Sequence, residues 1–220
     1  MKRFSGKISN KLELINKAMH HHDLYQEIVG KIVNEFAEQT GKKSVLEIGC
    51  GSGLTTRQLA KNNVKMTAVD NEPKLLRQAP SLRNVIYVEA DALDYLKKAV
   101  QFDIIVSVFT YHNMTPEYRK EIFKKSFDSL SKGGLWITAD KIAYPQTYKK
   151  DMKWQMEQFK VYDKIQRPDL RRAWEKHYIE DEKFIIFENE LKKFLAEIGF
   201  IDIQRIRKDH MEMIFCARKP

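Results

Sequence analysis

The chain has 220 residues, of which 43% are hydrophobic and 31% charged, and its formal net charge is +9. This apolar content excludes collagen-like, low-complexity and disordered chains, because those cannot build a hydrophobic core. The length fits a single domain over residues 1–220. The positive charge leaves two interpretations open, an acidic partner or a lysine-rich solvated surface.

The two cysteines, Cys50 and Cys216, are far apart and belong to no CxxC or Cys/His pattern. We therefore expect neither a disulfide framework nor a structural zinc site, and we assign no metal. The basic stretch 1–7 is followed by no apolar run of the kind found in signal peptides, and every apolar stretch is too short to span a bilayer. These features indicate a cytoplasmic protein without a membrane span.

Residues 1–43 carry apolar side chains at three- and four-residue spacing, which is typical of amphipathic helices. We expect these helices to form a cap at 1–43 that closes one side of the functional site. The histidine run at 20–22 cannot direct all its side chains to one face of a helix. One of the three is expected near the mouth of the site.

From Ser44 onward, short apolar runs alternate with amphipathic segments. The predicted strands are 44–48, 65–69, 85–88, 102–108 and 134–138, and the predicted helices lie near 55–61, 73–78, 92–98 and 116–131. This alternation predicts a parallel sheet with helices on both faces. A helix at 188–198 then ends at Gly199, and two strands, 201–207 and 211–217, form a final antiparallel pair.

Residues 141–185 interrupt this alternation and are rich in aromatic, methionine and charged residues. The composition predicts helices rather than strands. Two interpretations remain open, a lid whose aromatic side chains line an apolar pocket, or a plain hydrophobic core between two extra helices. The aromatic residues concerned are Tyr144, Tyr148, Trp154, Phe159, Tyr162, Trp174 and Tyr178.

The sharpest motif runs from Glu47 to Gly53, where an apolar strand leads into three glycines at alternate positions. Glycine permits a tight turn and lets a ligand approach the backbone without a Cβ in the way. The spacing differs from the dinucleotide fingerprint, because the third glycine comes one residue early. No Lys-Ser/Thr pair follows, which excludes a phosphate-gripping P-loop.

These residues resemble the E/D-x-G-x-G-x-G motif of the class I S-adenosylmethionine-dependent methyltransferases, position by position. The resemblance implies an α/β fold of Rossmann-like type, with a mostly parallel seven-stranded sheet, an antiparallel last strand, helices on both faces, N-terminal helices and a helical lid insert. It divides the chain into a cap at 1–43, a cofactor-binding core at 44–140, the lid at 141–185, and a C-terminal helix and hairpin at 186–220. The alternative is a glycine turn that only packs a helix against a strand.

The resemblance also implies S-adenosyl-L-methionine as the cofactor. The glycine loop would wrap its methionine part through Glu47, Gly49, Cys50, Gly51 and Gly53. No other residues of the motif are assigned.

Two further acids end predicted strands. The family places its ribose-binding acid at the position of Asp70, and Asn71 would lie beside the adenine. The alternative for Asp70 is an N-cap of the helix that begins near Pro73. The resemblance also assigns Asp91 and Ala92 to the adenine, while an N-cap is again the alternative for Asp91.

The residues after the fourth strand are the catalytic candidates, because ligands of open parallel sheets bind beyond the carboxyl ends of the strands. Many small-molecule enzymes of the resembling family carry a histidine-containing loop here. We choose His112 as general base, since histidine ordinarily titrates near neutral pH. Tyr111 would hydrogen-bond the substrate or the cofactor's carboxylate, and Phe109 is assigned to cofactor binding.

Two points about this loop stay open. His112 has the alternative roles of packing on the cofactor or capping the helix near Pro116. Asp140, which ends the fifth strand, reaches the same edge of the sheet and is a second candidate.

The resulting hypothesis is an S-adenosylmethionine-dependent methyltransferase that acts on a small molecule. The chain has no Asp/Asn-Pro-Pro-Tyr/Phe motif and no Pro-Cys nucleophile of the resembling nucleic-acid enzymes. An RNA- or tRNA-modifying enzyme remains an alternative because of the positive charge, although 28 of the 39 basic residues are lysine and the chain shows no interleaving of arginine with aromatic residues suited to reading nucleic acid. A cofactor-binding protein without methyl transfer is the other alternative. The substrate, the methylated atom and the oligomeric state stay undetermined.

Overall fold

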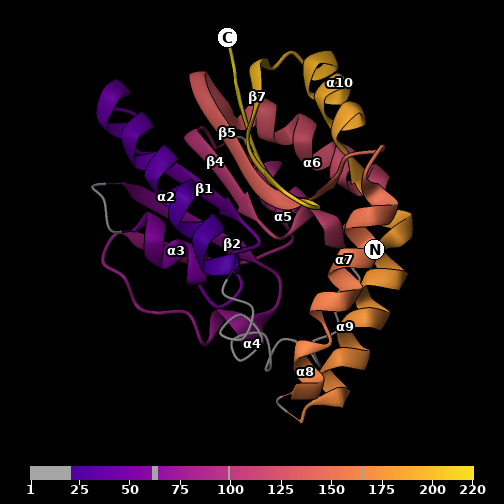
Figure 1. The fold of residues 1–220 in the computed structure, drawn as a ribbon. Coiled ribbons are helices and arrows are strands. Elements are labelled where there is room, and N and C mark those ends of the chain that lie inside the picture. The colour runs from indigo at the N-terminus through magenta and orange to yellow at the C-terminus, as the bar shows by residue number, and fades with distance from the viewer. Residues whose placement is uncertain (1–20, 61–63, 99, 165) are drawn as a thin grey trace.

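A single sheet with helices on both faces organises residues 21–60, 64–98, 100–164 and 166–220, which the computed structural model describes (Figure 1). The strand order is β3-β2-β1-β4-β5-β8-β7, and the short strand β6 pairs with β5 off this path. The strands are β1 Ser44–Ile48, β2 Lys65–Asp70, β3 Val85–Glu89, β4 Phe102–Val108, β5 Leu130–Ala143, β6 Ile186–Phe187, β7 Ile201–Asp209 and β8 Glu212–Arg218.

The pairing of the strands confirms the predicted fold class. Strands β3, β2, β1, β4 and β5 pair in parallel, whereas β8 is antiparallel to both β5 and β7. The chain order reverses between β1 and β4, which makes the carboxyl ends of these two strands the switch point of the sheet. Two details differ from the prediction, because β6 adds an eighth strand and β5 is 14 residues long instead of five.

The helices connect these strands in the predicted places. They are α2 His21–Thr40, α3 Leu54–Leu59, α4 Pro73–Leu76, α5 Ala92–Leu96, α6 Pro116–Ser129, α7 Tyr148–Gln158, α8 Val161–Lys164, α9 Pro168–Asp181 and α10 Glu188–Ile198, with 3₁₀ turns η1 Tyr111–Asn113 and η2 Glu182–Phe184. Helices α2 and α3 cover one face of the sheet, and α5, α6 and α10 cover the other (Figure 1).

Helix α2 packs flat on the sheet. Its buried stripe of Tyr25, Val29 and Val33 joins the core formed by β4 and β5 on that face. Residues 1–20 of the predicted cap, and the side chains of the histidine run, lie outside what the structure describes.

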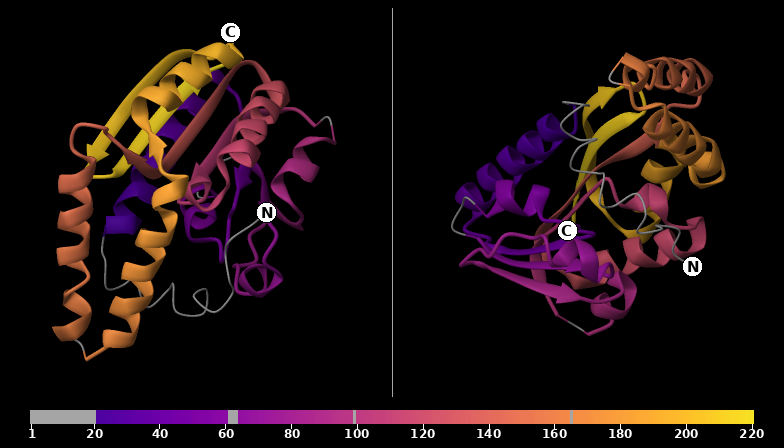
Figure 2. Two further views of the ribbon diagram at one scale, coloured as in Figure 1. Left: turned by 90° about the vertical axis from the view of Figure 1, so that its right-hand side faces the viewer. Right: turned by 90° about the horizontal axis from the view of Figure 1, so that it is seen from below.

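The insert between β5 and α10 is helical, as predicted, and α7 and α9 extend beyond the sheet (Figure 2). Its aromatic side chains form a separate small core, in which the Phe159 ring stacks on Trp174 and meets Tyr178 edge to face. This arrangement favours the plain-core interpretation for most of the aromatic residues. In the described ranges no helix combines the length and the apolar character needed to cross a membrane.

The core on the α6 face is built on aromatic contacts. Phe123 of α6 is 3% exposed and lies edge-on to Tyr111 and Trp136, at ring-centroid distances of 4.9 and 5.5 Å. Such rings contribute both buried area and favourable edge-to-face geometry.

We therefore expect Phe123→Ala to lower the free energy of unfolding by about 3–5 kcal/mol, since it leaves a cavity that its rigid neighbours cannot fill. Urea denaturation measures the change. Ile86→Ala is the matched control, because Ile86 is 67% exposed and its truncation should cost less than about 0.5 kcal/mol. Equal losses in the two variants would contradict this account of the core.

Candidate functional site

The loop after β1 depends on backbone conformations that only glycine adopts easily. Gly49, Gly51 and Gly53 have φ values of 74°, 54° and 79°, all in the left-handed region. The backbone N–H groups of Gly49 and Cys50 both donate to the carbonyl oxygen of Val69, at 2.8 and 3.2 Å. These bonds fold the loop across the ends of β1 and β2.

Gly49 also packs against the loop that follows β4. A Cβ at Gly49 would lie 2.3 Å from the side chain of Thr110, so no other residue fits there. The Thr110 hydroxyl donates to the carbonyl oxygen of Gly49 at 3.3 Å. The glycine loop and the predicted catalytic loop are therefore in direct contact.

Glu47 lies beneath the loop. Its carboxylate is 1% exposed and accepts a hydrogen bond from the Thr56 hydroxyl of α3 at 2.6 Å. Burial raises the pKa of Glu47 from 4.5 to about 7. The acid of the motif thus ties β1 to α3. Burial also raises the pKa of the Cys50 thiol.

Asp70 braces the glycine loop from the end of β2. Its Oδ2 accepts the N–H of Gly51 at 2.9 Å, and its Oδ1 accepts the N–H of Glu72 at 2.8 Å. Helix α4 is capped by Glu72, whose carboxylate accepts the N–H of Lys74, so the alternative of Asp70 as that N-cap is wrong. Asn71, next to Asp70, is exposed.

Asp91 caps α5, as its alternative interpretation predicted. Its Oδ1 accepts the N–H groups of Leu93 and Asp94 at 2.9 and 3.3 Å, and Ala92 is the buried first residue of the helix. The same oxygen accepts the hydroxyl of Tyr118 from α6 at 2.5 Å. Sequence analysis did not single out Tyr118.

Asp140 and His112 form a buried pair. Asp140 lies within β5, which continues to Ala143 instead of ending there as predicted, and His112 lies in the 3₁₀ turn η1 after β4. Asp140 is 0% exposed, and its Oδ1 is 2.5 Å from Nδ1 of His112. Its oxygens also accept the N–H groups of Thr110, Tyr111 and Lys141, at 3.2, 2.7 and 2.7 Å. Burial opposes ionisation of Asp140, but the attraction of His112 and these hydrogen bonds hold its pKa below the ordinary value.

The pairing sets the direction of the His112 ring. Asp140 accepts a hydrogen bond from Nδ1, so the neutral form of the His112 ring carries its proton on that nitrogen. Thr115, not His112, caps α6, so the capping alternative for His112 is wrong. His112 is 6% exposed, and the ring of His177 from α9 lies edge-on at a centroid distance of 6.1 Å. No sequence pattern pointed to His177.

Tyr111 does not share the position of His112. Its ring is 1% exposed and lies in the aromatic core, edge-on to Phe123 and stacked at 6.1 Å on Trp136. The reason is the 3₁₀ turn, in which successive side chains point about 120° apart. The Tyr111 hydroxyl is buried in this core, and the catalytic role expected for Tyr111 stays a prediction.

Phe109 makes the sharp turn that follows β4. It has a φ of 51°, and its N–H donates to the carbonyl oxygen of Ala139 at 2.8 Å. Its ring meets Tyr25 of α2 edge to face at 5.8 Å. The predicted cofactor residue thus lies between the sheet edge and α2.

Arg119 fastens the His112 loop to the end of the insert. Its buried guanidinium donates to the carbonyl oxygens of Tyr111, Met114 and Phe184, at 3.2, 3.4 and 2.9 Å. Burial lowers the pKa of Arg119 to about 10, which still leaves it charged at neutral pH. Sequence analysis missed Arg119 because its three partners are backbone atoms that are remote in the chain or in a loop.

The insert is held to the sheet at a second point. The Lys141 ammonium lies 3.8 Å from the ring centroid of Tyr178 and 5.9 Å from that of Trp174, a cation–π arrangement. Lys141 stands opposite Glu212 of β8, whose pKa burial raises to about 7. Helix α9 is thereby fixed across the end of β5.

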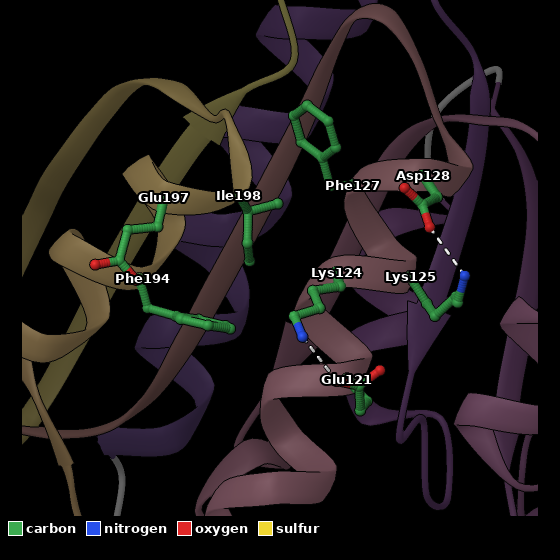
Figure 3. A pocket seen from close by; sticks show the side chains of 8 residues that line it. All are labelled: Glu121, Lys124, Lys125, Phe127, Asp128, Phe194, Glu197 and Ile198. Atoms are coloured by element: carbon green, nitrogen blue, oxygen red, sulfur yellow. Dashed lines mark hydrogen bonds and ion pairs between the residues drawn. The ribbon is translucent and has the colours of Figure 1, made fainter.

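A separate cavity of about 460 Å³ lies between α6 and α10. Figure 3 shows its lining side chains on either side of the groove, with ion pairs from Lys124 to Glu121 and from Lys125 to Asp128. None of the candidate residues lines it. In the described part of the chain, no group of three or more histidine, cysteine or acidic side chains is placed to hold a metal ion.

Comparison with known proteins finds a family model that matches part of the chain and relatives of low identity. Residues 45–134 match the model of a methyltransferase domain. An uncharacterized methyltransferase of Bacillus licheniformis is 25% identical over 131 residues, 59% of this chain and 61% of that protein. The chain therefore spans less than two thirds of this relative. A carboxy-S-adenosyl-L-methionine synthase of Campylobacter fetus is 20% identical over 207 residues, 89% of this chain and 85% of that protein.

Solved structures share the fold at lower identity. The plantazolicin methyltransferase BpumL, in complex with SAH, aligns over 96% of this chain and 91% of its own, with a TM-score of 0.67 and 13% identity. The CurJ carbon methyltransferase covers 88% of this chain and 53% of its own, with a TM-score of 0.63 and 17% identity. These likenesses confirm the predicted Rossmann-like fold.

The contact between Gly49 and Thr110 predicts that a side chain at position 49 lowers the stability of the protein. Gly49→Ala should destabilise the protein by about 1–3 kcal/mol more than Gly41→Ala, measured by thermal unfolding. Gly41 is the matched control, since it also has a positive φ, of 72°, but a Cβ there would meet nothing within 4 Å. Thr110→Gly in the Gly49→Ala background should recover part of the loss. Equal effects at the two glycines would refute the close packing of the loops.

The raised pKa of Glu47 predicts that the stability of the protein depends on pH. The folded chain holds its proton up to about pH 7, whereas the unfolded chain releases it near pH 4.5, so stability is lost as pH rises between these values. A shift of this size corresponds to roughly 3 kcal/mol. Glu47→Gln cannot ionise and keeps an acceptor for Thr56.

We expect the free energy of unfolding of Glu47→Gln to fall less than that of the parent between pH 5 and pH 8. Urea denaturation at pH 5 and at pH 8 measures the free energy of unfolding of both proteins. Glu121→Gln, on the exposed surface of α6, should retain the parent's dependence. A Glu47→Gln variant with the parent's full dependence would show that Glu47 ionises normally in the folded state.

Proposed function

We propose that this chain, whose residues 45–134 match the model of a methyltransferase domain, transfers a methyl group from S-adenosylmethionine to a small-molecule acceptor. One observation carries the proposal: the His112–Asp140 pair stands beside the glycine loop at the switch point of the sheet, joined to it through Thr110. The cofactor-binding half and the proton-accepting half of such a site are thereby within one contact of each other.

The residues around the glycine loop fit the cofactor. Among the described residues, a Cβ at Gly51 would meet only Leu75, at 3.7 Å, so a ligand can approach the backbone there. We assign the methionine part of the cofactor to this loop and the ribose hydroxyls to Asp70. Each carboxylate oxygen of Asp70 accepts one backbone N–H and retains capacity for a second donor.

The other half of the cofactor would lie against α5. We assign the adenine to Asp91 and Ala92, with Asn71 beside it, and place Phe109 next to the cofactor at the end of β4. The family likeness and the position of these residues after their strands support this assignment.

The cofactor supplies a methyl group on a positively charged sulfur, which makes the leaving group good. What the protein must add is alignment of the acceptor and, for a hydroxyl or amine, removal of its proton. Nε2 of His112 would accept that proton. Asp140 would hold the ring through Nδ1 and stabilise the imidazolium, because its own carboxylate is fixed by three backbone N–H groups.

The burial of His112 supports a small acceptor. His112 is only 6% exposed, and the insert packs on it through His177. A base within an RNA strand would need the insert to move away, whereas a small molecule needs far less room.

A second candidate is synthesis of carboxy-S-adenosyl-L-methionine. The synthase of Campylobacter fetus aligns over 89% of this chain, which includes most of the insert as well as the cofactor domain. In that case S-adenosylmethionine itself would be converted to the product, and the labelled methyl carbon would stay on it instead of passing to an acceptor.

The test combines binding and product search. The protein is incubated with methyl-labelled S-adenosylmethionine and cell extract, and label is sought in small metabolites, lipid and RNA. We expect label in small metabolites. His112→Gln should lower the rate by about 10²–10⁴-fold while S-adenosylhomocysteine binding, measured by calorimetry, stays unchanged.

Asp70→Asn should instead weaken S-adenosylhomocysteine binding, with Asp128→Asn on the outer surface of α6 as its control. Absence of S-adenosylhomocysteine binding by the parent protein would overturn the cofactor assignment. Full turnover by His112→Gln would show that His112 is not the base. Label in RNA would favour the nucleic-acid alternative. A cofactor heavier by one carboxyl group would favour synthesis of carboxy-S-adenosyl-L-methionine.

A further inference from the structure

We infer that Tyr118, in the first turn of α6, is a positioning residue of the cofactor site, whose hydroxyl holds the Asp91 carboxylate in the orientation that receives the adenine amine. The inference rests on the proposed function, because it takes Asp91 to face the cofactor. It adds a residue from a helix that the sequence analysis did not connect with the cofactor.

The contacts of Asp91 converge on one oxygen. Oδ1 accepts the Tyr118 hydroxyl at 2.5 Å and the N–H groups of Leu93 and Asp94 at 2.9 and 3.3 Å. A hydroxyl-to-carboxylate bond of this length belongs to the strong, charge-assisted class. Rotation of the carboxylate would break all three bonds, so they hold its plane in one orientation.

Tyr118 also reaches the backbone beside the expected adenine position. Its hydroxyl oxygen accepts the N–H of Leu93 at 3.3 Å while its proton goes to Asp91. Burial, followed by the hydrogen bond to Asp91, raises the pKa of Tyr118, so the hydroxyl remains a donor at neutral pH. One phenol thus fixes both the side chain and the backbone at the start of α5.

The position of Tyr118 itself is held from two sides. Thr115 caps α6 and accepts the N–H of Tyr118 at 3.4 Å. The next residue, Arg119, is bonded to the His112 loop and to the end of the insert. The first turn of α6 therefore links the expected adenine position with the expected acceptor position through two neighbouring residues.

The experiment is a comparison of two ligands by calorimetry on the full chain. S-adenosylhomocysteine carries the exocyclic amine, and S-inosylhomocysteine has a carbonyl oxygen in its place. Tyr118→Phe should weaken S-adenosylhomocysteine binding by about fivefold to tenfold, the loss expected for one hydrogen bond. Binding of S-inosylhomocysteine should change by less than about twofold, because no amine meets Asp91 in that complex.

The controls separate positioning from general loss of structure. Tyr95→Phe, on α5, should bind both ligands like the parent, and thermal unfolding of Tyr118→Phe checks its fold. In the Asp91→Asn background, Tyr118→Phe should add no further selective loss of S-adenosylhomocysteine, since the tyrosine acts through the carboxylate.

Equal weakening of both ligands by Tyr118→Phe, or no weakening of S-adenosylhomocysteine, would overturn the inference and leave Tyr118 a packing residue. If Tyr118→Phe does not fold, equal affinity of the parent for the two ligands would overturn the inference, because no amine would then meet Asp91. Failure of the parent to bind S-adenosylhomocysteine at all is a different result, which would overturn the proposed function.

Discussion

The arrangement of the loops at the carboxyl ends of β1 and β4 depends on the buried carboxylate of Asp140. Asp140 lies within β5 with no exposure to solvent, and a charge in that position is tolerated only when hydrogen bonds replace its water. Three backbone N–H groups and the His112 ring do so. Two of these N–H groups belong to the loop after β4, so satisfying the charge also shapes that loop. The loop in turn brings Thr110 against Gly49 and so sets the distance between the His112 loop and the glycine loop.

Helices α6 and α9 connect the His112 loop and β5 with the rest of the molecule. Helix α6 begins directly after the His112 loop, and its first turn sends Tyr118 toward the start of α5 and Arg119 back to the loop. Arg119 also reaches Phe184 at the end of the insert, and Lys141 holds α9 through the ring of Tyr178. The insert is thus anchored at both of its connections to the sheet. Movement of the insert would disturb the surroundings of His112 through these contacts, because they are made to the same loop and the same strand.

Much of the fold was predictable because its signals are local. Strand β1 and the glycines after it form one continuous pattern, and helix α10 ends at Gly199 with a φ of 113°, as a helix-stop glycine should. The length of β5 was not predictable, because its second half pairs with β8 and β6, which lie much later in the chain. The side-chain directions in the His112 loop could not be predicted from the sequence pattern either. A 3₁₀ turn directs Tyr111 into the aromatic core, while His112 stays at the edge of the sheet.

The sequence by itself determined the strands and helices, the glycine loop and the acids Asp70 and Asp91 that follow strands, because each is set by residues close together in the chain. Only the tertiary structure decided which of these residues meet. Asp140 with His112, Tyr118 with Asp91, and His177 against His112 each join residues 27 to 65 positions apart. Such partners are chosen by packing and by the need to satisfy buried polar groups, and no local spacing encodes them.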